Sequence, residues 1–81
     1  MHLFDVQLFN TVELNEYATW PKSITIEGNE SGARGIAIAA GTASSSITVS
    51  NVSGRFLDGE QIIFTNDYNL TRSALKVIRY D

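Results

Sequence analysis

Residues 24–38 read ITIEGNESGARGIAI, and this stretch decides the fold class. Isoleucines alternate with polar or small residues on both sides of the polar run 28–32. A period of two is typical of β-strands, and glycine, asparagine and serine are the residues that tight turns require. The stretch therefore predicts a β-hairpin with strands at 22–27 and 33–39. The side chains that this pattern directs inward are Ile24, Ile26, Ile36 and Ile38.

The same alternation recurs along the rest of the chain. It predicts further strands at residues 2–14, 47–52, 60–65 and 73–80, joined by a connection over 15–21 and a turn of small residues over 41–46. Within the last strand the apolar side chains change parity at Val77 and Ile78, which predicts a β-bulge there. The run Ile62-Ile63-Phe64 predicts burial on both faces of its strand.

About six short strands separated by turns predict a single all-β domain over residues 1–81, either a small antiparallel barrel or a compact β-sandwich. At 81 residues the chain is one domain at most. Its end directly after a strand favours a piece of a longer protein. The predicted core consists of Phe4, Val6, Leu8, Ile24, Ile26, Ile36, Ile38, Ile47, Val49, Phe56, Ile62, Phe64, Leu75 and Val77.

Composition narrows the classes of function. Six basic against nine acidic residues give a net charge of −3, which argues against a nucleic-acid partner. The N-terminus has neither the basic region nor the apolar run of a signal peptide, and the longest stretch of low polarity, 35–41, is far shorter than the roughly 20 residues of a transmembrane helix. We therefore expect no membrane partner.

The sequence offers few groups for catalysis or for holding a metal. There is no cysteine, and the single histidine, His2, lies at the chain end. Oxygen ligands for calcium gather at Asn66, Asp67 and Asn69, but the glycine and the bidentate glutamate of a calcium loop are missing. We expect no metal and no cofactor.

Two pairs of acidic residues, Asp58 with Glu60 and Glu27 with Glu30, have the composition of a general acid and base. Both pairs flank predicted turns, so solvated carboxylates are the simpler interpretation. No catalytic residue is predicted, and we do not expect an enzyme.

The apolar N-terminal strand is more informative. A domain of this size cannot bury all of it, and exposed strands of this kind pair with another chain. We therefore predict a homo-oligomer whose interface contains Leu3, Phe4, Val6, Leu8 and Phe9. The alternative is a small carbohydrate- or receptor-binding module whose stacking platform consists of Tyr17, Trp20 and Tyr68.

Two segments carry a resemblance to a known group of proteins. Ser31-Gly32-Ala33-Arg34-Gly35 is followed about twenty positions later by VSGRFLDGEQI at residues 52–62. This pattern resembles small β modules in virion structural proteins of tailed bacteriophages, especially phages of marine cyanobacteria. The strand FDVQLF at residues 4–9 is similar to the one that precedes these modules. The resemblance covers most of residues 22–64.

The resemblance implies a structural or assembly module of a tail, baseplate or fibre, with other virion proteins as partners. It also implies a location in the virion, after assembly in the host cytoplasm, and no catalytic residues. One departure concerns residues 64–74, which are longer than the corresponding part of these modules and contain no glycine.

Overall fold

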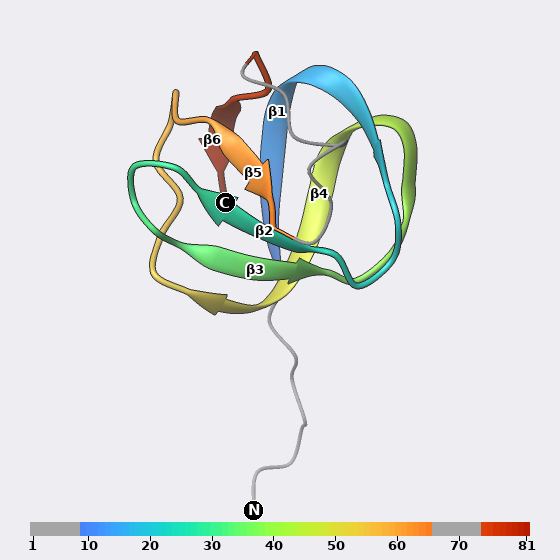
Figure 1. Cartoon of the computed structure of the whole chain (residues 1–81), viewed down its shortest axis with the longest axis horizontal. Helices are drawn as coiled ribbons and strands as arrows, with labels where there is room; N and C mark the ends of the chain where they lie inside the picture. Colours follow the sequence, from blue (N-terminus) through green and yellow to red (C-terminus); the bar gives the residue numbers. More distant parts are fainter. Residues whose placement is uncertain (1–8, 66–73) are drawn as a thin grey trace, which may run out of the picture.

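The computed structural model describes residues 9–65 and 74–81, and every regular element in these ranges is a β-strand (Figure 1). The antiparallel strands form one sheet in the order β5-β2-β3-β4-β1-β6, which confirms the predicted all-β class. In chain order the strands are β1 (Asn10–Trp20), β2 (Thr25–Gly28), β3 (Arg34–Ala37), β4 (Gly41–Ser53), β5 (Ile62–Phe64) and β6 (Val77–Tyr80).

The sheet curls until its two outer strands approach each other. Backbone hydrogen bonds join residues 59–62, which lead into β5, to residues 75–77, which lead into β6; one of them runs from the amide of Ile62 to the carbonyl of Leu75 at 3.0 Å. Gln61 and Lys76 form an isolated antiparallel bridge at the same place. The architecture is therefore an open barrel bridged at one end. Of the two predicted alternatives, a small barrel and a compact β-sandwich, the chain forms the barrel.

The hairpin predicted from residues 24–38 is confirmed. β2 and β3 pair in the register Thr25↔Ile36, Ile26↔Gly35 and Glu27↔Arg34. The bulge predicted at the end of the chain is also present, because the β1–β6 register jumps from Glu13↔Arg79 to Leu14↔Val77.

The predicted connection over residues 15–21 is wrong, because β1 continues to Trp20 (Figure 1). Three successive exposed residues, 15–17, interrupt the alternation of the strand. They lie where the β1–β4 register shifts between Glu13 and Ala18. A bulge adds residues without ending a strand, so its sequence looks like that of a loop.

The turn predicted over residues 41–46 is also wrong, because these residues form the first half of β4. They pair with the second half of β1, and Gly41 lies opposite Trp20. A Cβ atom at Gly41 would overlap the ring of Trp20, and the ring atom Cη2 would be 2.6 Å away. Gly41 therefore allows the strand to pack closely against an aromatic ring.

The inward orientation predicted for Ile36 and Ile38 is wrong, because both are only half-buried and it is Gly35 and Ala37 that face the core. The interior of the barrel is too narrow at β3 for an isoleucine. A Cβ atom at Gly35 would already lie 3.0 Å from the Cβ of Val49. Ile63 is half-buried as well, so β5 is not covered on both faces as predicted.

The core fills the inside of the barrel. Nine of the predicted core residues are buried, whereas Phe4, Val6 and Leu8 lie outside the described residues. The nine are Ile24, Ile26, Ile47, Val49, Phe56, Ile62, Phe64, Leu75 and Val77. The predicted core omitted seven further apolar residues that are buried: Val12, Leu14, Ala18, Trp20, Ala33, Ala37 and Tyr80.

The contact between Gly41 and Trp20 leads to a prediction about stability. We expect Gly41→Ala to lower the free energy of unfolding by about 1–3 kcal/mol, because the new methyl group overpacks a filled site. Thr42→Ala, at the neighbouring exposed position, should change it by less than about 0.5 kcal/mol. Urea unfolding of the two variants measures the difference, and equal midpoints would contradict the packing described here.

Candidate functional site

A groove of about 530 Å³ lies on the outer surface, over β3, the end of β4 and the residues just before β2. Its apolar lining consists of Phe9, Ile36, Ala37 and Ile38. Phe9 is 46% exposed and the two isoleucines are half-buried, so these three apolar side chains are in part accessible to solvent here. We call this feature the outer groove.

The remaining lining residues of the outer groove are polar: Lys22, Ser23, Ser50 and Asn51. Among the described residues that line it, Lys22 alone carries a charge. Ser23 and Asn51 have backbone φ angles of 69° and 53°. L-residues seldom adopt this left-handed conformation, and such residues gather at binding and switch sites.

The conformation of Ser23 is held by the sheet itself. Its amide donates a hydrogen bond of 2.9 Å to the carbonyl of Ala37, in the apolar lining of the outer groove. Asn51 lies in β4 where the β3–β4 register shifts, between the pairs Arg34↔Ser53 and Ile36↔Ser50. The pairing of the strands therefore fixes the backbone of the groove at these two positions.

The structure describes part of the predicted interface. Of the predicted interface, Phe9 is described and lies in the outer groove, whereas Leu3, Phe4, Val6 and Leu8 lie outside the described residues. The period of two assigns Ile36 and Ile38 to the core, but it cannot tell the two faces of a strand apart. The left-handed conformations of Ser23 and Asn51 have no clear signal in the sequence.

The predicted stacking platform is not formed as expected. Tyr17 is 70% exposed, but only 3% of Trp20 is accessible to solvent. The indole Nε1 of Trp20 donates a hydrogen bond of 3.0 Å to the carbonyl of Ala39. The ring of Trp20 is therefore part of the core and offers no face to a sugar, while Tyr68 lies outside the described residues.

The second notable feature is a buried acid. Glu60 is 1% exposed, so the prediction of a solvated carboxylate is wrong at this position. Its Oε1 accepts hydrogen bonds of 2.8 Å from the amides of Glu30 and Ser31. Its Oε2 accepts hydrogen bonds from the Ser31 hydroxyl at 2.8 Å and from the Leu57 amide at 2.6 Å.

The environment of Glu60 determines its protonation. Burial is the largest single influence and acts to raise the pKa of Glu60, but the hydrogen bonds from Leu57, Ser31 and Glu30 together outweigh it. The pKa of Glu60 is therefore lowered from its usual value of 4.5. An ionised carboxylate whose oxygens already accept four hydrogen bonds acts as a structural link between the β2–β3 turn and residues 57–60.

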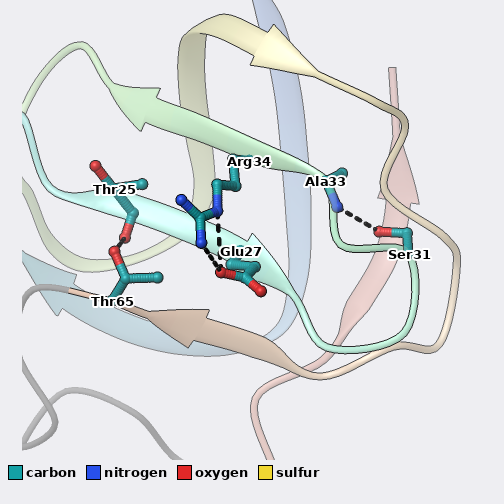
Figure 2. A network of polar contacts seen from close by, with 6 residues as sticks. All are labelled: Thr25, Glu27, Ser31, Ala33, Arg34 and Thr65. Carbon is teal, nitrogen blue, oxygen red and sulfur yellow. Dashed lines mark hydrogen bonds and ion pairs between the residues drawn. The ribbon is translucent and has the colours of Figure 1, made fainter.

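The other carboxylates of the two predicted pairs are arranged differently. Asp58 and Glu30 are exposed. Glu27 pairs across the β2–β3 hairpin with Arg34, whose Nη2 lies 3.1 Å from Glu27 Oε1 (Figure 2). Close by in the turn, the Ser31 hydroxyl also accepts a hydrogen bond of 3.1 Å from the Ala33 amide (Figure 2).

Residues 9–65 and 74–81 contain no group of three or more histidine, cysteine or acidic side chains placed to hold a metal ion. The calcium ligands considered at Asn66, Asp67 and Asn69 lie outside the described residues. No helix within the described ranges has the length and hydrophobicity to cross a membrane.

No family model matches the chain, and neither the curated proteins nor the solved structures contain a significant match to it.

Proposed function

We propose that this chain is a structural module that acts through protein–protein contacts. The observation that carries the proposal is the outer groove, where the exposed Phe9 and the half-buried Ile36 and Ile38 lie beside polar residues. Exposed apolar surfaces rimmed by polar residues are characteristic of sites where proteins bind one another. The proposal assigns no catalytic residue and no cofactor.

The proposed setting is the virion of a tailed bacteriophage, where the module would connect proteins of the tail or baseplate. This part rests on the resemblance of residues 31–35 and 52–62 to virion β modules. The glycines in these segments have a structural use in the fold, since Gly32, Gly54 and Gly59 have φ angles of 71°, 80° and 88°.

The alternative function, carbohydrate or receptor binding through stacked aromatic rings, has less support. Trp20 of the predicted platform is buried in the core. Among the described residues of the platform, Tyr17 is the exposed ring. A single ring gives little stacking area, and the apolar lining of the outer groove suits protein side chains better than a polar sugar.

Light scattering across a concentration series tests the assembly function. We expect the mass of the full chain to rise above the 8.9 kDa of one copy as its concentration increases. Phe9→Asp should weaken this association by about tenfold or more, because it places a charge on an apolar contact surface.

Ile78→Asp is the matched control, because Ile78 is 57% exposed and lies outside the outer groove. It should leave the association unchanged. A mass of one copy at all concentrations would contradict self-association, and equal effects of the two variants would contradict the assignment of the contact to the outer groove.

A further inference from the structure

Asp58-Gly59 is the single place in the sequence where glycine follows an aspartate or an asparagine. Aspartate in this position isomerises without an enzyme, because the glycine has no side chain to hinder attack by its backbone nitrogen. We propose that the fold holds Asp58 back from this isomerisation to isoaspartate, and that isomerisation, once it occurs, releases the β2–β3 turn from Glu60. The proposal is independent of the assembly function.

The reaction needs no partner other than water. The backbone nitrogen of Gly59 attacks Cγ of Asp58 and loses its proton, and a carboxyl oxygen leaves as water. The product is a cyclic succinimide. Water then opens the ring at either carbonyl carbon: attack at Cγ restores aspartate, whereas attack at the backbone carbonyl carbon gives isoaspartate, in which the chain continues through Cβ and Cγ.

The surroundings of this pair leave room for the ring. Asp58 and Gly59 are both exposed, so water reaches them. Among the described residues, apart from the two chain neighbours of Gly59, no heavy atom lies within 4 Å of the place that a Cβ atom of Gly59 would occupy. Steric crowding therefore does not protect the pair in the folded chain.

The hydrogen bonds of the folded chain oppose the first step instead. The amide of Gly59, which contains the attacking nitrogen, donates a hydrogen bond of 2.6 Å to the carbonyl of Val77. The amide of Val77 donates one of 2.9 Å to the carbonyl of Glu60. Both bonds belong to the bridge that closes one end of the barrel. The nitrogen of Gly59 is therefore free to attack Asp58 when this bridge opens locally.

Glu60 closes the same turn with two further bonds. Its amide donates a hydrogen bond of 3.3 Å to the carbonyl of Leu57, and its Oε2 accepts one of 2.6 Å from the Leu57 amide. Its Oε1 meanwhile accepts hydrogen bonds from the amides of Glu30 and Ser31 in the β2–β3 turn. The length of the turn over residues 57–60 therefore determines whether the carboxylate reaches all of these groups.

Isoaspartate changes that length. It inserts a methylene carbon into the backbone between Cα of Asp58 and the nitrogen of Gly59. The two bonds between Leu57 and Glu60 span this insertion, and they cannot keep their geometry while Gly59 stays bonded to Val77. We therefore expect the isomerised chain to lose the hydrogen bonds that Glu60 makes in the folded protein.

Incubation of the full chain at constant pH and temperature tests the protection. Methyl transfer by protein isoaspartyl methyltransferase counts the isoaspartate, and electron-transfer fragmentation locates it. Isoaspartate should form at least about tenfold faster in the urea-unfolded chain than in the folded chain, because the rate follows the population of the open state. Urea below the unfolding transition should leave the rate low, which excludes an effect of urea on the chemistry itself.

Three variants make the measurement specific. Asp58→Ser should remove the isoaspartate at this position. Glu60→Gln should give an intermediate rate under folding conditions, because it weakens the bonds that close the turn. Glu16→Gln is the matched control, since it removes the same charge from an exposed side chain of β1, and it should leave the rate unchanged.

The isomerised chain, separated by chromatography, tests the consequence for Glu60. Its urea midpoint should be lower than that of the unmodified chain, and Glu60→Gln should lower the midpoint less in the isomerised chain, because the same bonds are already lost. Equal rates in the folded and unfolded chains would overturn the protection. Absence of isoaspartate from the unfolded chain would overturn the site, and an unchanged midpoint after isomerisation would overturn the release of the turn.

Discussion

Glu60→Gln should lower the free energy of unfolding by about 2–4 kcal/mol at neutral pH, although glutamine has the same shape as glutamate. The carboxylate accepts four hydrogen bonds, two at each oxygen. The amide group of glutamine keeps one accepting oxygen, but its NH2 group can only donate. The NH2 would therefore face groups that now donate to a carboxylate oxygen. When that NH2 replaces Oε2, the amide of Leu57 loses its partner inside the protein.

Asp58→Asn is the matched control. It removes the same charge from an exposed side chain that lies two residues before Glu60 in the sequence. It should change the free energy of unfolding by less than about 0.5 kcal/mol. Chemical denaturation of both variants measures the effect. Equal losses would show that Glu60 stabilises the fold by its contribution to net charge and not by its hydrogen bonds.

The pH dependence of stability gives a second measurement of the same link. The pKa of Glu60 is lowered from its usual value of 4.5 in the folded chain, so the folded state favours the ionised form. The stabilisation is therefore fully present above pH 4.5 and is lost as the pH falls through the folded pKa. The difference in stability between the unmodified chain and Glu60→Gln should shrink over this acidic range.

A comparison of sequence and structure shows where local patterns suffice. The hairpin at 24–38 and the bulge at Val77–Ile78 are predictable because each depends on residues close in sequence. The polar run 28–32 marks the turn by its composition, and the change of parity at Ile78 marks the extra residue.

Features that depend on distant residues are not predictable in the same way. Glu60 lies about thirty residues from the turn amides that it binds, and Asp58-Gly59-Glu60 on its own looks like an ordinary solvated turn. The orientation of β3 depends on Val49 in another strand, which leaves space for Gly35 but not for an isoleucine. Such features can be predicted only when it is known which strands are neighbours.

For the same reason, the sequence predicts part of the candidate site and not the rest. Phe9 is recognisable as an exposed apolar residue at the end of an apolar segment. Ile36 and Ile38 have the pattern of core residues, and their exposure becomes clear only with the sheet. Ile36 of β3 and the following Ile38 thus face the outer groove, while Gly35 and Ala37 face the barrel interior.

Trp20→Ala should lower the free energy of unfolding by about 3–5 kcal/mol, which is the usual cost of removing a large buried aromatic side chain. The ring packs against Gly41 and its Nε1 donates to the Ala39 carbonyl, so truncation removes apolar contacts and leaves a carbonyl unpartnered. Because small domains have little stability to spare, Trp20→Phe provides a milder variant, with an expected loss of about 1–2 kcal/mol.

Phe9→Ala is the matched aromatic control, since Phe9 is 46% exposed, and it should cost about 1 kcal/mol or less in dilute solution. Trp20 is the single tryptophan, so its fluorescence reports its own environment directly. Emission should shift to longer wavelength only on unfolding. If Trp20→Phe instead left stability unchanged and abolished binding to a glycan, the ring would have to be exposed in solution, and the platform function would replace the core role argued here.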